Sequence, residues 1–108
     1  MDSRQDKINT LLQEKIALII NANFDFPEVF LTVLRVSADN NVSELIVEIS
    51  VLPQKLTGSV LKDLRRQSAF FAKEIQKKAK LKRVPKISWR VEDRNKDVSS
   101  LENLLNSL

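Results

Sequence analysis

The spacing of apolar residues constrains the fold of this chain most, because it changes between the helical period and the strand period along the sequence. Residues 4–21 carry a helical stripe made of Ile8, Leu11, Leu12, Ile16, Ile19 and Ile20. Segments 29–37 and 44–52 are rich in β-branched residues instead, and the second places on one face Leu45, Val47, Ile49 and Val51. The turn sequence ADNNVS between these two segments predicts a β-hairpin.

A second helix and a third strand follow the hairpin in the pattern. A long helical segment begins near residues 56–59 and reaches about Lys80. The stretch VPKISWRVED (84–93) predicts a strand that has on one side Ile87, Trp89 and Val91. SSLENLLNSL (99–108) predicts a short closing helix, because it opens with capping-box spacing. We therefore expect one α+β domain over residues 1–108, with helices packed on a three-stranded sheet.

The residue types that carry most enzyme chemistry are absent or rare in this chain. It has no cysteine and no histidine, which excludes disulfides, thiolate metal sites and the Ser-His and Cys-His nucleophile pairs. Gly58 is the only glycine, so a P-loop, a G-x-G-x-x-G turn and the G-x-x-G loop of ordinary KH domains are excluded as well. No pair of carboxylates stands out by its spacing. We expect neither an enzyme nor a bound metal or cofactor.

The first residues and the lengths of the apolar runs predict the cellular location of the protein. The first ten residues, MDSRQDKINT, are polar and of mixed charge, which is typical of neither a signal peptide nor a transit peptide. No apolar run approaches the roughly 20 residues that cross a bilayer. We expect a cytoplasmic protein without a membrane contact.

Positive charge is concentrated in one segment. From Lys55 to Arg90 there are 12 Lys and Arg against 2 Asp and Glu, a net charge of +10, whereas the rest of the chain carries −6 and the whole chain +4. On a helix with about 100° per residue, one arc roughly 60° wide holds Lys62, Arg66, Lys73, Lys77 and Lys80. Neighbouring like charges destabilise a helix, so a stripe that only served solubility would alternate with Glu. The segregation favours a surface for a polyanion, and for nucleic acid in particular, over an ordinary solvated face.

The candidate phosphate contacts are the cations of this helix and of the stretch that follows it: Arg65, Arg66, Lys73, Lys77, Lys80, Lys82 and Arg83. Lys86 and Arg90 extend the same surface if the third strand lies beside the helix. Phosphate contacts position RNA without reading its sequence. Specificity would then come from the shape of the RNA or from its unpaired bases.

Three more residues have both a structural and a functional interpretation. Phe70 lies on the basic side of a continuous helix, where it would stack on a base, but a bend at QSA would rotate it into the core. We favour the bend, because Ser68 can bond a carbonyl one turn earlier. Trp89 is in phase with the apolar residues of its strand and is predicted to be core. Asp39 lies in the hairpin turn, where Asp commonly bonds the backbone, and is predicted to be structural.

Several stretches together carry a resemblance to a known family. They are the opening helix RQDKINTLLQEKIALII, the hairpin VLRVSADNNVSELIVEISVL with its Val36-Ser37-Ala38-Asp39 run, the segment LKDLRRQSAFFAKEIQKKAKLKRVPKISWRVED, and SLENLL. The third stretch ends in a basic-x-x-Pro-x-hydrophobic-x-aromatic pattern formed by Lys82, Pro85, Ile87 and Trp89. In these features the chain resembles the bacterial ribosome-binding factor A proteins over nearly its whole length. It departs from them at Gln67-Ser68-Ala69, where the family usually has Ala-x-Gly.

The resemblance implies a type II KH-like fold in the order α-β-β-α(kinked)-β-α, in which a kinked helix–helix junction replaces the glycine loop. It also implies a ribosome assembly factor that is not an enzyme. Such a factor binds the small ribosomal subunit or its precursor, contacts ribosomal RNA near the decoding region, assists maturation of the 5′ end of that RNA and is often important in the cold. We expect a monomer. Two alternatives are a general KH-like RNA-binding protein and a protein-interaction module that docks on an acidic partner.

Overall fold

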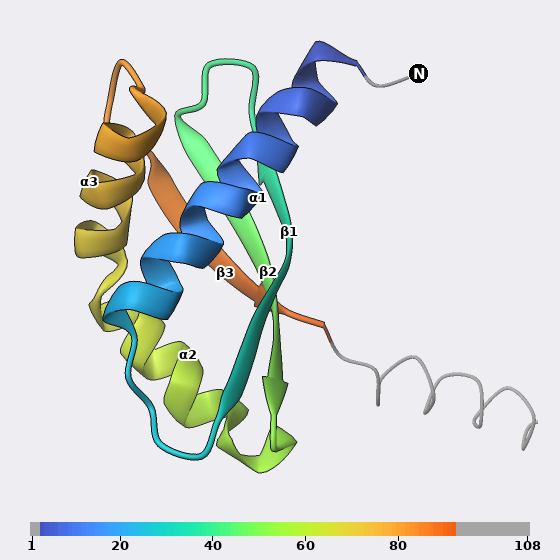
Figure 1. The fold of residues 1–108 in the computed structure, drawn as a ribbon, viewed down its shortest axis with the longest axis vertical. Helices are drawn as coiled ribbons and strands as arrows, with labels where there is room; N and C mark the ends of the chain where they lie inside the picture. Colours follow the sequence, from blue (N-terminus) through green and yellow to red (C-terminus); the bar gives the residue numbers. More distant parts are fainter. Residues whose placement is uncertain (1–2, 93–108) are drawn as a thin grey trace, which may run out of the picture.

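The computed structural model describes residues 3–92, and its elements follow one another as the spacing predicts (Figure 1). They are α1 (Arg4–Asn23), β1 (Phe30–Ala38), β2 (Glu44–Leu52), the short 3-10 helix η1 (Gln54–Leu56), α2 (Thr57–Arg66), α3 (Ser68–Ala79) and β3 (Lys86–Val91). The predicted first helix, hairpin and third strand are confirmed. The predicted closing helix over residues 99–108 lies outside the described residues. Among residues 3–92, no helix combines the length and the apolar character needed to cross a membrane.

The three strands form one sheet with β2 in the centre. β1 and β2 pair antiparallel, beginning with Phe30 opposite Leu52 and with one irregularity between Val33 and Arg35. β3 pairs with β2 in parallel. A parallel pair needs a crossover connection, which α2 and α3 supply. These two helices and α1 therefore cover one face of the sheet (Figure 1).

One hydrophobic core fills the space between the helices and the sheet. β2 contributes the alternate residues that the sequence predicts, namely Leu45, Val47, Ile49 and Val51. The helices contribute Leu12, Ile16, Ile19 and Ile20 from α1, Val60 and Leu64 from α2, and Phe71, Ala72 and Ile75 from α3. Trp89 on β3 is only 6% exposed, which confirms its predicted place in the core. Because the core uses the apolar sides of α2 and α3, their opposite sides face solvent.

The helical segment between residues 56 and 80 is not continuous but is divided at Gln67. This residue departs from helical geometry (φ −97°, ψ 7°), and its N–H donates to the carbonyls of Asp63 and Leu64 at 3.1 and 3.2 Å. The Oγ of Ser68 donates to the Leu64 carbonyl at 3.0 Å. A serine hydroxyl that bonds a carbonyl one turn earlier bends a helix. The Ser68 hydroxyl therefore accounts for the junction between α2 and α3.

Candidate nucleic-acid interface

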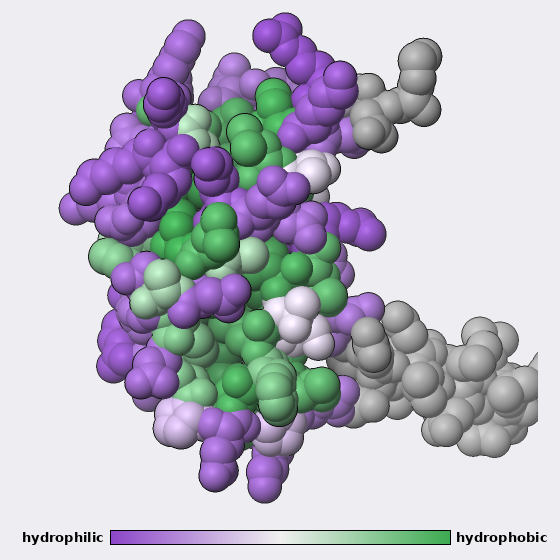
Figure 2. Space-filling model, viewed as in Figure 1, coloured by the Kyte–Doolittle hydropathy of each residue, from purple (hydrophilic) through white to green (hydrophobic). Residues whose placement is uncertain are grey.

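The exposed sides of α2, α3 and the loop after α3 carry the predicted cations. Figure 2 shows hydrophilic side chains gathered over α3 and this loop. The nine predicted phosphate contacts are all exposed: Arg65, Arg66, Lys73, Lys77, Lys80, Lys82, Arg83, Lys86 and Arg90. Exposure makes each of them available to a ligand in solution, and the fold decides which of them lie together.

The junction at Gln67 changes the arrangement of these cations. They do not form one arc along a single helix, because α2 and α3 have separate axes. On α2, Arg66 forms an ion pair with Asp63, although its side chain remains 77% exposed. On α3, Lys73 and Lys77 are four residues apart and so lie on one face of the helix. Lys73 and Lys77 therefore lie on one face of one helix, as the predicted arc requires.

A groove beside the junction, here called the junction groove, brings three predicted residues together. It has a volume of about 490 Å³. Arg65 at the end of α2, Lys73 on α3 and Lys86 at the start of β3 line it. The apolar part of its lining is made of Ala69, Ala72, Val84, Pro85 and Ile87. Cations beside apolar surface suit a nucleotide chain, because the phosphate needs charge and the base needs a flat apolar contact.

A second group of cations, here called the loop cluster, consists of Lys80, Lys82 and Arg83. These residues line a hollow of about 390 Å³ together with residues 40–42 of the hairpin turn. Lys80 adopts a left-handed conformation (φ 55°, ψ 47°) that ends α3, and its N–H donates to the Gln76 carbonyl. This sharp turn directs the chain away from the helix axis. The loop cluster is therefore positioned by the helix end and not by helical phase.

Arg90 does not join either group. Ile87 and Trp89 are buried beneath the helices, and side chains of a strand alternate between its two faces. Arg90 therefore lies on the face of the sheet that points away from α2 and α3. In the register it stands beside Glu48 of β2, which in turn pairs with Arg35 of β1. By the same alternation Lys86 belongs to this face too, but it stands at the first residue of β3 and lines the junction groove, which Arg90 does not. The RNA contact of Arg90 therefore stays a prediction, although β3 packs against both helices.

Phe70 remains 42% exposed, so the expectation that the bend turns it into the core is wrong. α3 begins anew at Ser68, and its phase directs Phe71 towards the sheet instead. The Phe70 ring meets Phe71 edge to face, with centroids 5.6 Å apart and planes at 64°. Phe71 is fully buried and meets Trp89 in the same manner, at 5.8 Å and 74°. The three rings form a continuous series from the core to the surface.

Sequence reasoning missed the bond that holds the junction against the sheet. The indole Nε1–H of Trp89 donates to the Oγ of Ser68 at 2.7 Å. These residues are 21 positions apart, and no local spacing connects them. The only signal in the sequence is a serine on a helix next to apolar residues, which is too common to identify a partner.

Asp39 is a structural turn residue, as predicted. Its carboxylate accepts the N–H of Ser43 at 2.7 Å and the N–H of Glu44 at 3.0 Å, and it also accepts the Ser43 hydroxyl. The Ser43 hydroxyl, followed by the Glu44 amide, lowers the pKa of Asp39 below its ordinary value. These bonds close the hairpin.

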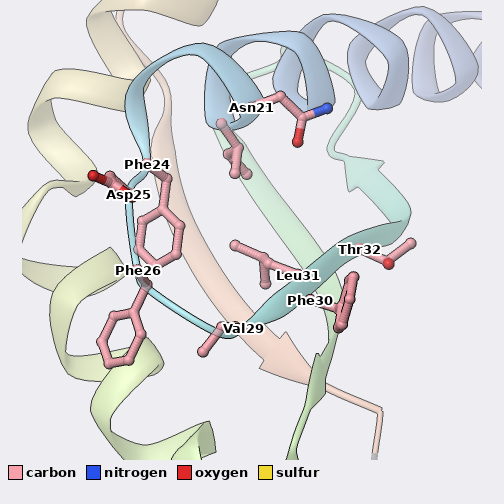
Figure 3. A pocket seen from close by; sticks show the side chains of 9 residues that line it. Asn21, Phe24, Asp25, Phe26, Val29, Phe30, Leu31 and Thr32 are labelled. Carbon is pink, nitrogen blue, oxygen red and sulfur yellow. The ribbon is translucent and has the colours of Figure 1, made fainter.

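A hollow beside the loop from α1 to β1 does not suit a polyanion. Its volume is about 300 Å³, and Asp25 is the one charged residue in its lining. Phe24 and Phe26 stack there with centroids 6.1 Å apart. Figure 3 shows Phe24 and Phe26 on the loop between α1 and β1, and Phe30 on β1, apart from both rings. Within residues 3–92, no group of three or more acidic side chains that could hold a metal ion occurs.

Comparison with known proteins gives one consistent result at the level of sequence. Residues 4–105 match the sequence model of the ribosome-binding factor A family. A curated relative is ribosome-binding factor A of Akkermansia muciniphila, which is 27% identical over 108 residues, with 100% of this chain and 86% of the relative covered.

Comparison of structures points to the same fold. The crystal structure of ribosome-binding factor A from Thermus thermophilus has a TM-score of 0.71 at 20% identity, with 81% of this chain and 94% of that chain covered. Coordinates of the T. thermophilus factor, a homology model fitted into the cryo-EM map of its complex with 30S, have a TM-score of 0.64 at 22% identity, with 74% and 86% covered. At these identities the likeness concerns the fold alone.

Proposed function

This chain belongs to the ribosome-binding factor A family, and from that membership we propose that it is a ribosome assembly factor that binds the small ribosomal subunit or its precursor. The T. thermophilus factor of similar fold, fitted into the map of a 30S complex, supports this proposal. We propose further that the protein assists maturation of the 5′ end of the small-subunit RNA. In this role it acts in the cytoplasm, including in the cold, as a monomer that holds RNA and does not catalyse a reaction.

The order of the described elements supports a type II KH-like domain over residues 1–108. Residues 3–92 contain a helix, two antiparallel strands, two consecutive helices and a parallel strand. The two consecutive helices meet at Gln67 without a glycine, so a helix–helix junction takes the place of the glycine loop. The junction groove lies beside this junction, between α3 and the entry to β3. In the proposed complex an RNA strand follows this groove.

The observation that carries the proposal is the exposure of cations with few acids to neutralise them. Between Lys55 and Arg90 the only acids are Asp63 and Glu74, and Asp63 is already paired with Arg66. RNA relieves the remaining repulsion, because each phosphate contact also releases condensed counterions. The junction groove and the loop cluster would hold the backbone, and the shape of the ribosomal RNA would supply specificity.

Co-sedimentation with purified small subunits, mature and precursor, over a series of salt concentrations tests the proposal. We expect binding to small but not to large subunits, with an affinity that falls steeply as salt rises. The double variant Lys73→Glu with Lys77→Glu should bind more weakly. Its log–log salt slope should be shallower by roughly 1.5, because two phosphate contacts are lost.

A matched control separates this site from net charge. The double variant Lys7→Glu with Lys55→Glu changes the charge by the same amount at exposed positions on α1 and η1. It should bind like the wild type. If the Lys73 and Lys77 variant bound as tightly as the control at every salt concentration, α3 would not be the RNA-binding surface.

Two other outcomes would assign a different function. Equal affinity at physiological salt for unrelated structured RNAs would indicate a general KH-like RNA-binding protein. Capture of an acidic protein partner that persists undiminished after nuclease treatment would indicate a protein-interaction module instead.

A further inference from the structure

Phe70 occupies a position on α3 that the core does not explain. It lies in the first turn of the helix and leaves 42% of its surface in solvent, whereas the adjacent Phe71 is fully buried. With about 100° per residue, Lys73 and Lys77 lie within roughly 60° of Phe70 around the helix. Both lysines are exposed. This face of α3 therefore presents an aromatic ring and two cations. Glu74 lies about 40° to the other side of Phe70, where it is half-buried and lines a hollow with Lys15 and Lys78.

The ring is held in place by contacts that reach into the core. Phe70 packs edge to face on Phe71, and Phe71 packs edge to face on Trp89. Trp89 bonds the Oγ of Ser68, which in turn bonds the Leu64 carbonyl across the junction. This arrangement fixes the start of α3 relative to β3, so the exposed part of the ring is presented in a constant position. Little conformational entropy is then lost when a flat ligand stacks on it.

From this geometry we propose that Phe70 is a stacking platform for one unpaired base of the bound RNA. Lys73 and Lys77 would hold the phosphates of the same strand. The proposal rests on the proposed function, since it names how RNA meets this surface. Phenylalanine offers no hydrogen-bond donor or acceptor, so the platform would favour an unpaired base without selecting its identity.

The stacked base would come from a single strand or a loop, because the bases of an RNA duplex already stack on one another and are not available. This distinguishes Phe70 from the lysines. The lysines attract any phosphate backbone, paired or unpaired. Loss of the ring should therefore affect unpaired RNA only, whereas loss of the lysines should affect both.

The experiment measures binding of two fluorescent probes by anisotropy, namely a 12-nucleotide oligo(A) and a 12-base-pair RNA duplex. Phe70→Leu keeps an apolar side chain without the aromatic face, and Phe70→Tyr keeps the face. We expect Phe70→Leu to weaken binding of oligo(A) by roughly 5- to 100-fold. Its affinity for the duplex and its salt slope on both probes should equal those of the wild type. Phe70→Tyr should restore binding of oligo(A).

Trp89 provides a control for the fold, because it is the only tryptophan and packs on Phe71, the ring that contacts Phe70. An unchanged Trp89 emission spectrum and melting temperature in Phe70→Leu would show that the core is intact. If Phe70→Leu bound oligo(A) as tightly as the wild type, or weakened both probes equally, the stacking role would be refuted.

Oligo(A) binding tests the stacking role, and co-sedimentation with small subunits tests the proposed function. A wild-type protein that sediments with small subunits, but binds oligo(A) no better than Phe70→Leu does, overturns the stacking role alone. A wild-type protein that fails to sediment with small subunits at low salt overturns the proposed function, and the stacking role with it.

Discussion

Ser68 and Trp89 form the contact on which the geometry of the candidate interface depends. The Trp89 indole N–H donates to the Ser68 hydroxyl at 2.7 Å, and the same hydroxyl donates to the Leu64 carbonyl at 3.0 Å. One oxygen therefore connects the end of α2, the start of α3 and the middle of β3. The junction groove is bounded by these same elements.

Ser68→Ala should destabilise the protein by about 1–3 kcal/mol, because it leaves a nearly buried indole N–H without an acceptor. Urea unfolding followed by Trp89 fluorescence measures the change. Ser88→Ala is the matched control, since Ser88 lies next to Trp89 on β3 and its side chain is exposed. A loss for Ser68→Ala no larger than that for Ser88→Ala would show that the bond is not important for stability.

Gly58→Ala should stabilise the fold by about 0.4–1 kcal/mol, because alanine restricts the unfolded chain more than glycine does. Gly58 lies in the first turn of α2, and a Cβ built there meets nothing within 4 Å. Thermal unfolding measures the gain. Binding to small subunits should stay the same, because the side chain is remote from the cations. A lower melting temperature would mean that the start of α2 is not helical as described.

Lys80→Gly and Lys80→Ala remove the same charge but differ in backbone freedom. Lys80 has a positive φ of 55° at the end of α3, a conformation that glycine adopts without strain. The glycine variant should therefore be more stable than the alanine variant by about 1 kcal/mol. Both should lose the same fraction of affinity for small subunits, since each loses one cation of the loop cluster. Equal stability of the two would argue against the left-handed turn, and unequal affinity would argue against a purely electrostatic role.

Asp39 should make the stability of the hairpin depend on pH. The bonds from Ser43 and Glu44 favour the ionised carboxylate and lower its pKa from the ordinary 3.8. Its contribution is therefore present above this ordinary pKa and is lost as pH falls through the lower pKa of the folded state. Asp39→Ala should reduce the melting temperature near neutral pH, and the gap from the wild type should close in acid.

NMR titration of the Asp39 carboxyl provides the direct measurement. Ser43→Ala removes the hydroxyl bond, which lowers the pKa of Asp39 most, and should raise this pKa towards its ordinary value. A wild-type titration at the ordinary value, or a gap in melting temperature that persists in strong acid, would contradict this account.

The positions of helices and strands could be predicted because they follow from local periodicity. The apolar residues of α1 lie on one side of the helix, and those of β2 on one face of the strand, so each element can bury them in only one orientation. The division at Gln67 was only partly predictable. Ser68 indicated a bend, but the phase in which α3 restarts depends on how Phe71 packs against Trp89. The side of Phe70 that meets solvent followed from that packing.

Periodicity in the sequence is enough to predict the first helix, the three strands, the apolar face of each and the place where positive charge is concentrated. The packing of α2, α3 and β3 against one another determines which cations line the same groove. Arg65, Lys73 and Lys86 come together in the junction groove, whereas Arg90 lies on the other face of the sheet. The physical reason is that periodicity describes each element about its own axis only. The relative placement of α2, α3 and β3 depends on a parallel crossover and on contacts between residues about 20 positions apart, such as Ser68 and Trp89.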